Sequence, residues 1–227
     1  MDKSILKSIA DTFNDSVYVY NGDQIQSQYS RLKNAFSGID KLQINYACKA
    51  LSNISILGLM NSIGTGLDTV SVQEVQLGIK AGFDPKKIIF TPNGVSMEEI
   101  EEVASLGVQI NIDNLSVLEQ FGSKHPKIPV CIRINPHVMA GGNSNISVGH
   151  IDSKFGISIH QIPHIIRIVE NTKMRINGVH MHTGSDILDI EVFLHAAEIL
   201  FETALKFKNL DFIILDNDIL RSPESSI

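Results

Sequence analysis

The sequence has only two cysteines, no excess of basic residues and no hydrophobic run long enough to cross a membrane. Cys48 and Cys131 each lie within a predicted strand, which indicates buried free thiols in a reducing compartment and argues against a disulfide framework. A net charge of −6 without a basic cluster argues against nucleic acid as the main partner. Residues 1–4 lead into an amphipathic pattern and not into a signal peptide. These features predict a soluble, cytoplasmic domain.

Strand-like and helix-like patterns alternate along most of the chain. From residue 24 onward, short apolar runs and segments with helical spacing repeat every two dozen residues or roughly so, which is typical of βα units on a parallel sheet. The expected strands are 42–49, 66–70, 87–91, 109–113, 130–135, 176–182 and 210–215. Because a closed barrel of this kind has eight strands, the pattern predicts an α/β fold, one strand short of a (β/α)8 barrel.

Local patterns add detail around these strands. Residues 5–13 have helical spacing, and residues 16–20 are predicted to form a strand that precedes the repeat and is a candidate for a separate sheet. Three expected helices begin with a serine followed three residues later by a glutamate, which is typical of a capping box and predicts a structural role for the glutamates. These pairs are Ser71–Glu74, Ser96–Glu99 and Ser116–Glu119.

Lys49 is the first candidate for chemistry. It ends the strand 42–49 and is expected to share a face with Asn45 and Ala47, while the bulky apolar residues take the other face. In a closed parallel barrel this places Lys49 inside, at the carboxyl end of a strand, where barrel enzymes keep their active sites. A lysine in a dry pocket loses its proton readily and becomes an amine nucleophile. The alternative is a lysine that is solvated or paired with a carboxylate.

Two further charged residues lie in or at predicted strands. Asp68 enters the second strand near the place to which Lys49 is expected to point, so it either orients the lysine or caps a turn. Arg133 lies on the face opposite Ile132 and Ile134. A charged side chain on an inward face needs a partner, which a bound anion or an aspartate can supply.

The sixth expected strand carries two histidines and ends in a small polar turn. His180 and His182 share one face, predicted to point inward. Two histidines at this spacing can bind a metal ion, although no third ligand is evident in the sequence. A flat imidazole can instead stack on an aromatic cofactor ring, and the turn at Gly184 and Ser185 can then offer backbone amides and a hydroxyl to a phosphate.

The order of these motifs resembles one known family. The motifs are Tyr-Ala-Cys-Lys-Ala at 46–50, Gly-Leu-Asp-Thr-Val-Ser at 66–71, Ile-Arg-Ile-Asn-Pro at 132–136, Gly-His-Ile-Asp-Ser-Lys-Phe-Gly at 149–156 and His-Met-His-Thr-Gly-Ser at 180–185. Together they resemble the diaminopimelate decarboxylases, which are pyridoxal-phosphate enzymes built on the alanine racemase type of barrel. The resemblance runs from about Ser16 to about Phe212.

The resemblance implies a cofactor, a reaction and roles for matching positions. Lys49 is implied to bind pyridoxal phosphate covalently and His182 to stack on its ring, so both count as catalytic. The other cofactor-binding positions that it implies are Asp68, Arg133, Gly184 and Ser185. The implied reaction is decarboxylation of the amino acid meso-diaminopimelate to lysine, in a homodimer with shared active sites. No metal site is implied.

The resemblance stops near Phe212. The family continues with a glycine-rich phosphate loop, whereas residues 213–221 contain no glycine, and Asp216 and Asp218 would repel an adjacent phosphate. We therefore expect a partial barrel that lacks the family's eighth strand and C-terminal β-domain, and is inactive alone. The expected division is residues 1–22 as a leading helix and strand that would join the β-domain in full-length relatives, 23–216 as the partial pyridoxal-phosphate-binding barrel and 217–227 as a divergent tail.

Two other functions remain open from the sequence. One is a related pyridoxal-phosphate decarboxylase that acts on arginine, ornithine or carboxynorspermidine, because the part that reads the far end of the substrate lies beyond the resemblance. The other is a catalytically dead homologue that binds a partner protein. The motifs Thr-Gly-Ser and Asp-Ser-Lys-Phe-Gly favour diaminopimelate.

Overall fold

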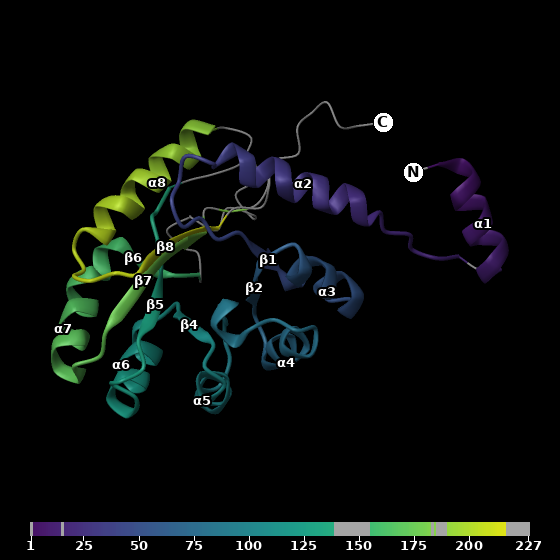
Figure 1. Ribbon diagram of the computed structural model, residues 1–227. Helices are drawn as coiled ribbons and strands as arrows, with labels where there is room; N and C mark the ends of the chain where they lie inside the picture. Colours follow the sequence, from purple (N-terminus) through teal and green to yellow (C-terminus); the bar gives the residue numbers. More distant parts are fainter. Residues whose placement is uncertain (1, 15, 139–154, 183, 185–189, 217–227) are drawn as a thin grey trace.

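The fold is an open, curved parallel sheet with helices along its outer side (Figure 1). The computed structural model describes residues 2–14, 16–138, 155–182, 184 and 190–216. The strands are β1 Asn45–Ala47, β2 Gly66–Thr69, β3 Ile88–Phe90, β4 Gln109–Ile112, β5 Val130–Asn135, β6 Ile157–Ser158, β7 Ile176–His182 and β8 Phe212–Asp216. Their order is β1-β2-β3-β4-β5-β7-β8, all neighbours are parallel, and the short β6 pairs with β5 off this path. The predicted α/β fold of an incomplete barrel is thus confirmed.

The helices follow the strands as the βα repeat predicts. They are α1 Lys3–Phe13, α2 Gly22–Ala35, α3 Ile54–Ser62, α4 Val72–Lys80, α5 Met97–Ser105, α6 Leu115–Lys124, α7 Ile162–Thr172 and α8 Ile190–Ala204. Short 3-10 turns, η1 Cys48–Ala50, η2 Pro85–Lys87 and η3 Ile159–Gln161, join some of them to the strands. Within the described ranges, no helix has both the length and the apolar composition that a membrane crossing needs.

Burial is greatest in the middle of the sheet and falls toward its two edges. Every residue of β5 and of β7 is buried, as expected for parallel strands covered on both faces. At the edges, the three residues of β1 are only partly buried, and β8 alternates between partly buried and exposed positions. Both cysteines are buried free thiols, as predicted. The central strands therefore provide the most rigid support for any site.

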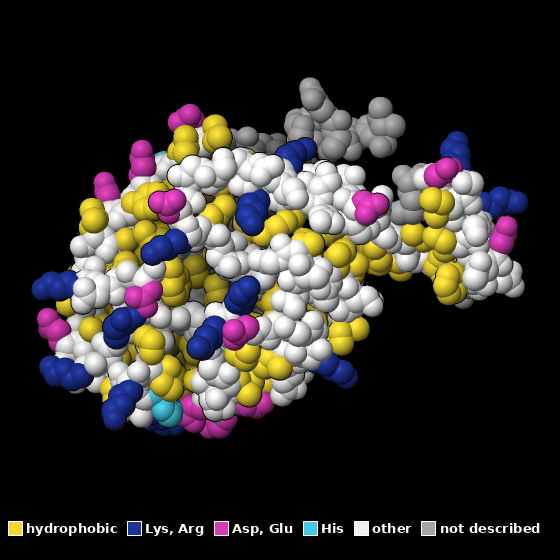
Figure 2. All heavy atoms as spheres, in the orientation of Figure 1, with side chains coloured by type: hydrophobic (Ala, Val, Ile, Leu, Met, Phe, Trp, Pro, Cys, Tyr) yellow, Lys and Arg dark blue, Asp and Glu magenta, His cyan; other side chains and the backbone are white. Residues whose placement is uncertain are grey.

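The first helix lies apart from this core, and the second lies at its edge, where Ile25 packs against the core. Neither α1 nor α2 has a buried residue, and Figure 1 shows α1 at the far end of an extended connection. In Figure 2, hydrophobic side chains are visible on the separate lobe that contains α1. The predicted strand at residues 16–20 is wrong: the segment is extended, with Tyr18 91% exposed, but it has no strand assignment. An apolar pattern forms a strand only where a neighbouring strand completes its hydrogen bonds.

Helix caps follow the sequence patterns in part. Ser96 and Glu99 form the predicted capping box at α5. At α4, the Ser71 side chain accepts from the Glu74 amide, as in the predicted box, but the Glu74 carboxylate accepts from the backbone N–H of Val70. The third predicted box, Ser116–Glu119, is wrong. The α6 helix begins one residue earlier, at Leu115, and Asn114 caps it by accepting from the amide of Val117.

Close packing of β7 against β8 generates a prediction about stability. A Cβ added at Gly178 would lie 2.2 Å from the ring of Phe212, its register partner on β8. We expect Gly178→Ala to lower the free energy of unfolding by about 1–3 kcal/mol, because the ring must move in a packed layer. Urea unfolding followed by circular dichroism measures this change.

The matched control is Gly58→Ala in α3. A Cβ at Gly58 meets nothing within 4 Å, so this variant should equal or exceed the wild type in stability through better helix propensity. Equal stability of the two alanine variants would contradict the proposed packing of Phe212 over Gly178.

Candidate functional site

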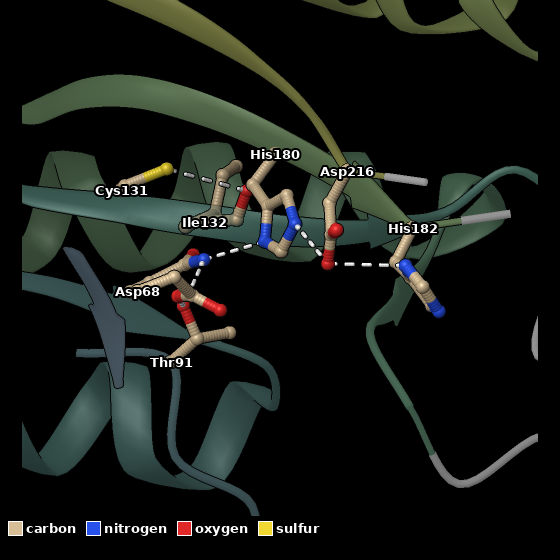
Figure 3. A network of polar contacts seen from close by, with 8 residues as sticks. Asp68, Thr91, Cys131, Ile132, His180, His182 and Asp216 are labelled. Carbon is tan, nitrogen blue, oxygen red and sulfur yellow. Dashed lines mark hydrogen bonds and ion pairs between the residues drawn. The ribbon is translucent and has the colours of Figure 1, made fainter. Parts of the chain in front are cut away.

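Polar side chains from most strands of the sheet meet on its inner face. Leu67 is directed to the outer face, because an added Cβ at Gly78 of α4 would lie 2.4 Å from its side chain. Side chains alternate along a strand, so Asp68 points to the inner face. The residues that meet it there or lie near it are Thr91, Asn111, Arg133, His180, His182 and Asp216. Figure 3 shows part of this cluster, with Asp68 and Thr91 on one side of His180 and with Asp216 and His182 on the other.

Asp68 holds its proton unusually strongly. Burial and the nearby negative charge of Asp216 raise the pKa of the Asp68 carboxyl to about 7, even though three groups oppose the shift. The strongest of these is Thr91, whose hydroxyl donates to Oδ1 of Asp68 at 2.8 Å, followed by the positive charges of Lys49 and Arg133. At neutral pH this carboxyl can therefore both hold and release a proton.

His180 is fully enclosed and paired on one side with an amide. Its Nδ1 lies 2.5 Å from Nδ2 of Asn111 on β4. Burial lowers the pKa of His180 to about 4, and the positive charges of Arg133 and His182 act in the same direction, whereas Asp216 opposes them. His180 is thus neutral at physiological pH.

Asp216, at the end of β8, lies between the two histidines (Figure 3). Its Oδ2 is 3.0 Å from Nδ1 of His182 and 3.7 Å from Nε2 of His180, although neither contact has the alignment of a hydrogen bond. Burial alone would raise the pKa of Asp216, but the two facing imidazoles outweigh it and hold that pKa well below its ordinary value. Asp216 therefore stays charged beside both rings.

Arg133 brings a positive charge into the centre of this face. It is 9% exposed, and burial lowers the pKa of its guanidinium while Asp216, Asp113 and Asp68 act against that shift. Its Cζ lies 5.0 Å from the ring centroid of Phe155. Of the two partners that the sequence leaves open for an inward Arg133, a bound anion or an aspartate, the structure has aspartates close enough to act on its charge.

Lys49 differs from its predicted placement. Strand β1 ends at Ala47, and Lys49 lies in the turn η1, with an exposed side chain and not in a dry pocket. The hydroxyl of Tyr46 donates to the carbonyl of Leu51 at 3.2 Å, which closes the turn, and the described residues place no strand beyond β1 to cover it. Lys49 is still near Asp68, because its charge lowers the pKa of that carboxyl.

The remaining predicted residues follow β7. His182 is its last residue, and the contacts of His180 with Asn111 and of both histidines with Asp216 confirm the predicted inward face. Gly184 is buried with φ +133°, a conformation that favours glycine. Ser185 lies outside the described residues, as do 139–154 and Asp218. In the described part of the chain, no three His, Cys, Asp or Glu side chains are grouped to hold a metal ion.

Sequence reasoning missed Thr91 and Asn111, and it assigned Asp216 no contact with the histidines. Thr91 and Asn111 are neutral and belong to no familiar motif, so only their position near strand ends could have pointed to them. Asp216 was interpreted as a group that would repel phosphate, whereas in the structure it faces His180 and His182. The pairing of β7 with β8, which places His182 opposite Asp216, is the signal that could have found it.

The chain was compared with known proteins. The family model described as "pyridoxal-dependent decarboxylase, pyridoxal binding domain" matches residues 22–214. Among curated relatives, the diaminopimelate decarboxylase of Methanothermobacter thermautotrophicus is 34% identical over 90% of this chain and 50% of its own length. That of Campylobacter jejuni is 34% identical over 94% of this chain and 54% of its own length. The chain thus spans about half the length of the curated relatives it matches.

Solved structures agree with this similarity. Diaminopimelate decarboxylase from Helicobacter pylori, complexed with L-lysine, superposes with a TM-score of 0.83 at 30% identity, over 96% of this chain and 59% of that one. The arginine decarboxylase of Paramecium bursaria Chlorella virus superposes with a TM-score of 0.81 at 18% identity, over 99% of this chain and 60% of that one. The latter likeness shows the fold alone.

The raised pKa of Asp68 generates a prediction about stability. Because its pKa is about 7 in the folded chain against an ordinary value of 3.8, the folded state binds the proton more tightly. This stabilisation is complete below pH 4 or so and is lost as the pH rises through about 7. Asp68→Asn should therefore exceed the wild type in free energy of unfolding at pH 8, by about 2–4 kcal/mol, with a smaller difference at pH 5.

Urea unfolding at both pH values measures this effect. Asp40→Asn, at an exposed site, controls for the loss of one negative charge from the chain. An Asp68→Asn variant that is less stable than the wild type at pH 8 would contradict the prediction, because it would show that the charged Asp68 carboxylate is favourably paired in the folded chain.

Proposed function

The chain belongs to the pyridoxal-dependent decarboxylase family, and from this premise we propose that it is the cofactor-binding part of a diaminopimelate decarboxylase. The observation that carries the choice of substrate is the 34% identity to two diaminopimelate decarboxylases over at least 90% of this chain. The proposed reaction releases carbon dioxide from meso-diaminopimelate and leaves lysine, a step of lysine biosynthesis. The solved Helicobacter pylori relative, complexed with L-lysine, supports an amino acid as the ligand.

The inner face of the sheet fits pyridoxal phosphate. Two buried ring nitrogens, His180 Nε2 and His182 Nδ1, and the buried oxygen Asn111 Oδ1 have no hydrogen-bond partner among the residues that the structure describes, so this face retains unused polar groups beside Asp68 and Arg133. The residues proposed to hold the cofactor are Lys49, Asp68, Arg133, His182, Gly184 and Ser185. When bound, pyridoxal phosphate supplies an electron-poor ring that takes up the electron pair left by the departing carboxylate.

Each proposed role follows from the environment of the side chain. The exposed amine of Lys49 can reach an aldehyde that approaches from solvent, and Asp68 beside it can accept or return a proton near neutral pH. Asp216 holds the buried ring of His182 in a defined orientation, as a stacking role requires. Arg133 keeps a positive charge at the centre of the site and so favours anionic groups there.

Several other features are part of the proposal. We propose that residues 1–22 lie outside the barrel, which the absence of buried residues in α1 supports, and that 23–216 form the partial barrel, followed by the tail 217–227. A cytoplasmic location is supported by the buried free thiols. A homodimer with shared active sites follows from the family resemblance alone. We expect the polypeptide alone to lack decarboxylase activity, because its sheet has open edges at β1 and β8.

The test is covalent trapping of the cofactor. Borohydride reduction of the purified chain with pyridoxal phosphate, followed by peptide mass mapping, should label Lys49 selectively, because the charge of Lys49 acts on Asp68 of the site. Lys49→Ala should lose this label. Lys80→Ala, which removes an exposed lysine of α4, is the matched control and should keep it. Labelling scattered over surface lysines would refute the proposed cofactor site.

A further inference from the structure

Three polar residues without a role in the proposed cofactor site connect its two ends. The hydroxyl of Thr91, next to β3, donates to Asp68 at 2.8 Å and accepts from Nδ2 of Asn111 at 3.3 Å. Nδ2 of Asn111 also lies 2.5 Å from Nδ1 of His180, whose other ring nitrogen faces Asp216. We call Thr91, Asn111 and His180 the belt. It runs across the inner face of the sheet from the end of β3 to β7, between Asp68 on β2 and Asp216 on β8.

The hydrogens of the belt have one consistent arrangement when Asp68 is charged. A charged carboxylate only accepts, so the single hydroxyl hydrogen of Thr91 is committed to Asp68, and the oxygen of Thr91 accepts from the amide of Asn111. The second hydrogen on Nδ2 of Asn111 then points to Nδ1 of His180. Nδ1 must therefore be the nitrogen without a hydrogen.

We propose that the belt holds His180 as the Nε2–H tautomer, so that the ring nitrogen 3.7 Å from Asp216 carries the hydrogen and attracts that carboxylate, which lies 3.0 Å from the ring of His182. Asn111 and His180 are then positioning residues, which act on the site through Asp216. The arrangement of the belt is argued from its own contacts, while the consequence for a cofactor ring rests on the proposed function of His182.

The charges around His180 agree with this arrangement. Arg133 is its register partner on β5, His182 follows it on β7, and Asp216 faces it from β8. Burial, together with Arg133 and His182, keeps the pKa of His180 at about 4, so the ring does not take a second proton near neutral pH. A neutral ring has one N–H, and Asn111 decides which nitrogen carries it.

The test reads the tautomer directly, by long-range ¹H–¹⁵N spectra of the histidine rings at pH 8. His180→Gln assigns the signal, because the resonance of that ring disappears. We expect the Nε2–H form of His180 to exceed the Nδ1–H form by at least about tenfold, since the latter would set two buried donors against each other. A dominant Nδ1–H form, or a doubly protonated ring, would overturn the proposal.

Asn111→Asp is the decisive variant, because it has nearly the same shape and replaces the donor by an acceptor. We expect it to move the proton of His180 to Nδ1. Asn177→Asp is the matched control. Asn177 is buried on β7, the strand of His180, but its side chain pairs with Gln109, so His180 should keep its Nε2–H form in this variant. An unchanged tautomer in Asn111→Asp would refute the belt.

Thr91 offers a second, milder pair of variants if Asn111→Asp does not fold. Thr91→Val removes the acceptor of Asn111, so the excess of one tautomer should fall, and Thr91→Ser should restore it. An equal excess in both variants would count against the belt. Trapping of the cofactor at Lys49 is a separate experiment. If Lys49 is not labelled but His180 has the expected tautomer, the cofactor site is refuted and the belt is not.

Discussion

The site depends on the burial of Arg133 among carboxylates. Removing a guanidinium from water costs several kcal/mol unless opposite charges and hydrogen bonds replace its hydration. Here Asp68, Asp113 and Asp216 approach from three other strands, and Phe155 covers the cation with its ring. Burial, with the charge of Arg133 acting in the same direction, sets the state of His180, whereas the two imidazoles set that of Asp216. His180 stays neutral, and Asp216 stays charged between two imidazoles.

The open sheet explains why some residues of the site are more deeply buried than others. Arg133 and His180 lie on β5 and β7, where every residue is buried, so packing fixes them from both faces. Lys49 and Asp216 lie at the two edges, next to β1 and on β8. Lys49 is accordingly exposed, whereas Asp216 is held by contacts to side chains of the neighbouring strand. A cofactor that bridges the face would join the ordered centre to the exposed lysine.

Much of the fold and part of the site follow from the sequence. The βα repeat predicts the order of the strands, and the period of two along β5 and β7 correctly places Arg133, His180 and His182 on the inner face. Local patterns fail where tertiary contacts decide. Residues 16–20 are not assigned as a strand, Asn114 and not Ser116 caps α6, and the chain turns after Ala47. Thr91 and Asn111 are found only when the strands are brought together.

The most direct test of the account is to record the ring signals of His180 and His182 before and after adding pyridoxal phosphate. If the inner face is a preformed cofactor site with the belt already in place, the signals of His182 shift while His180 keeps its tautomer, and the exposed His195 is unaffected. Shifts at His195 without any at His182 would contradict the account, because the cofactor would then bind outside the inner face.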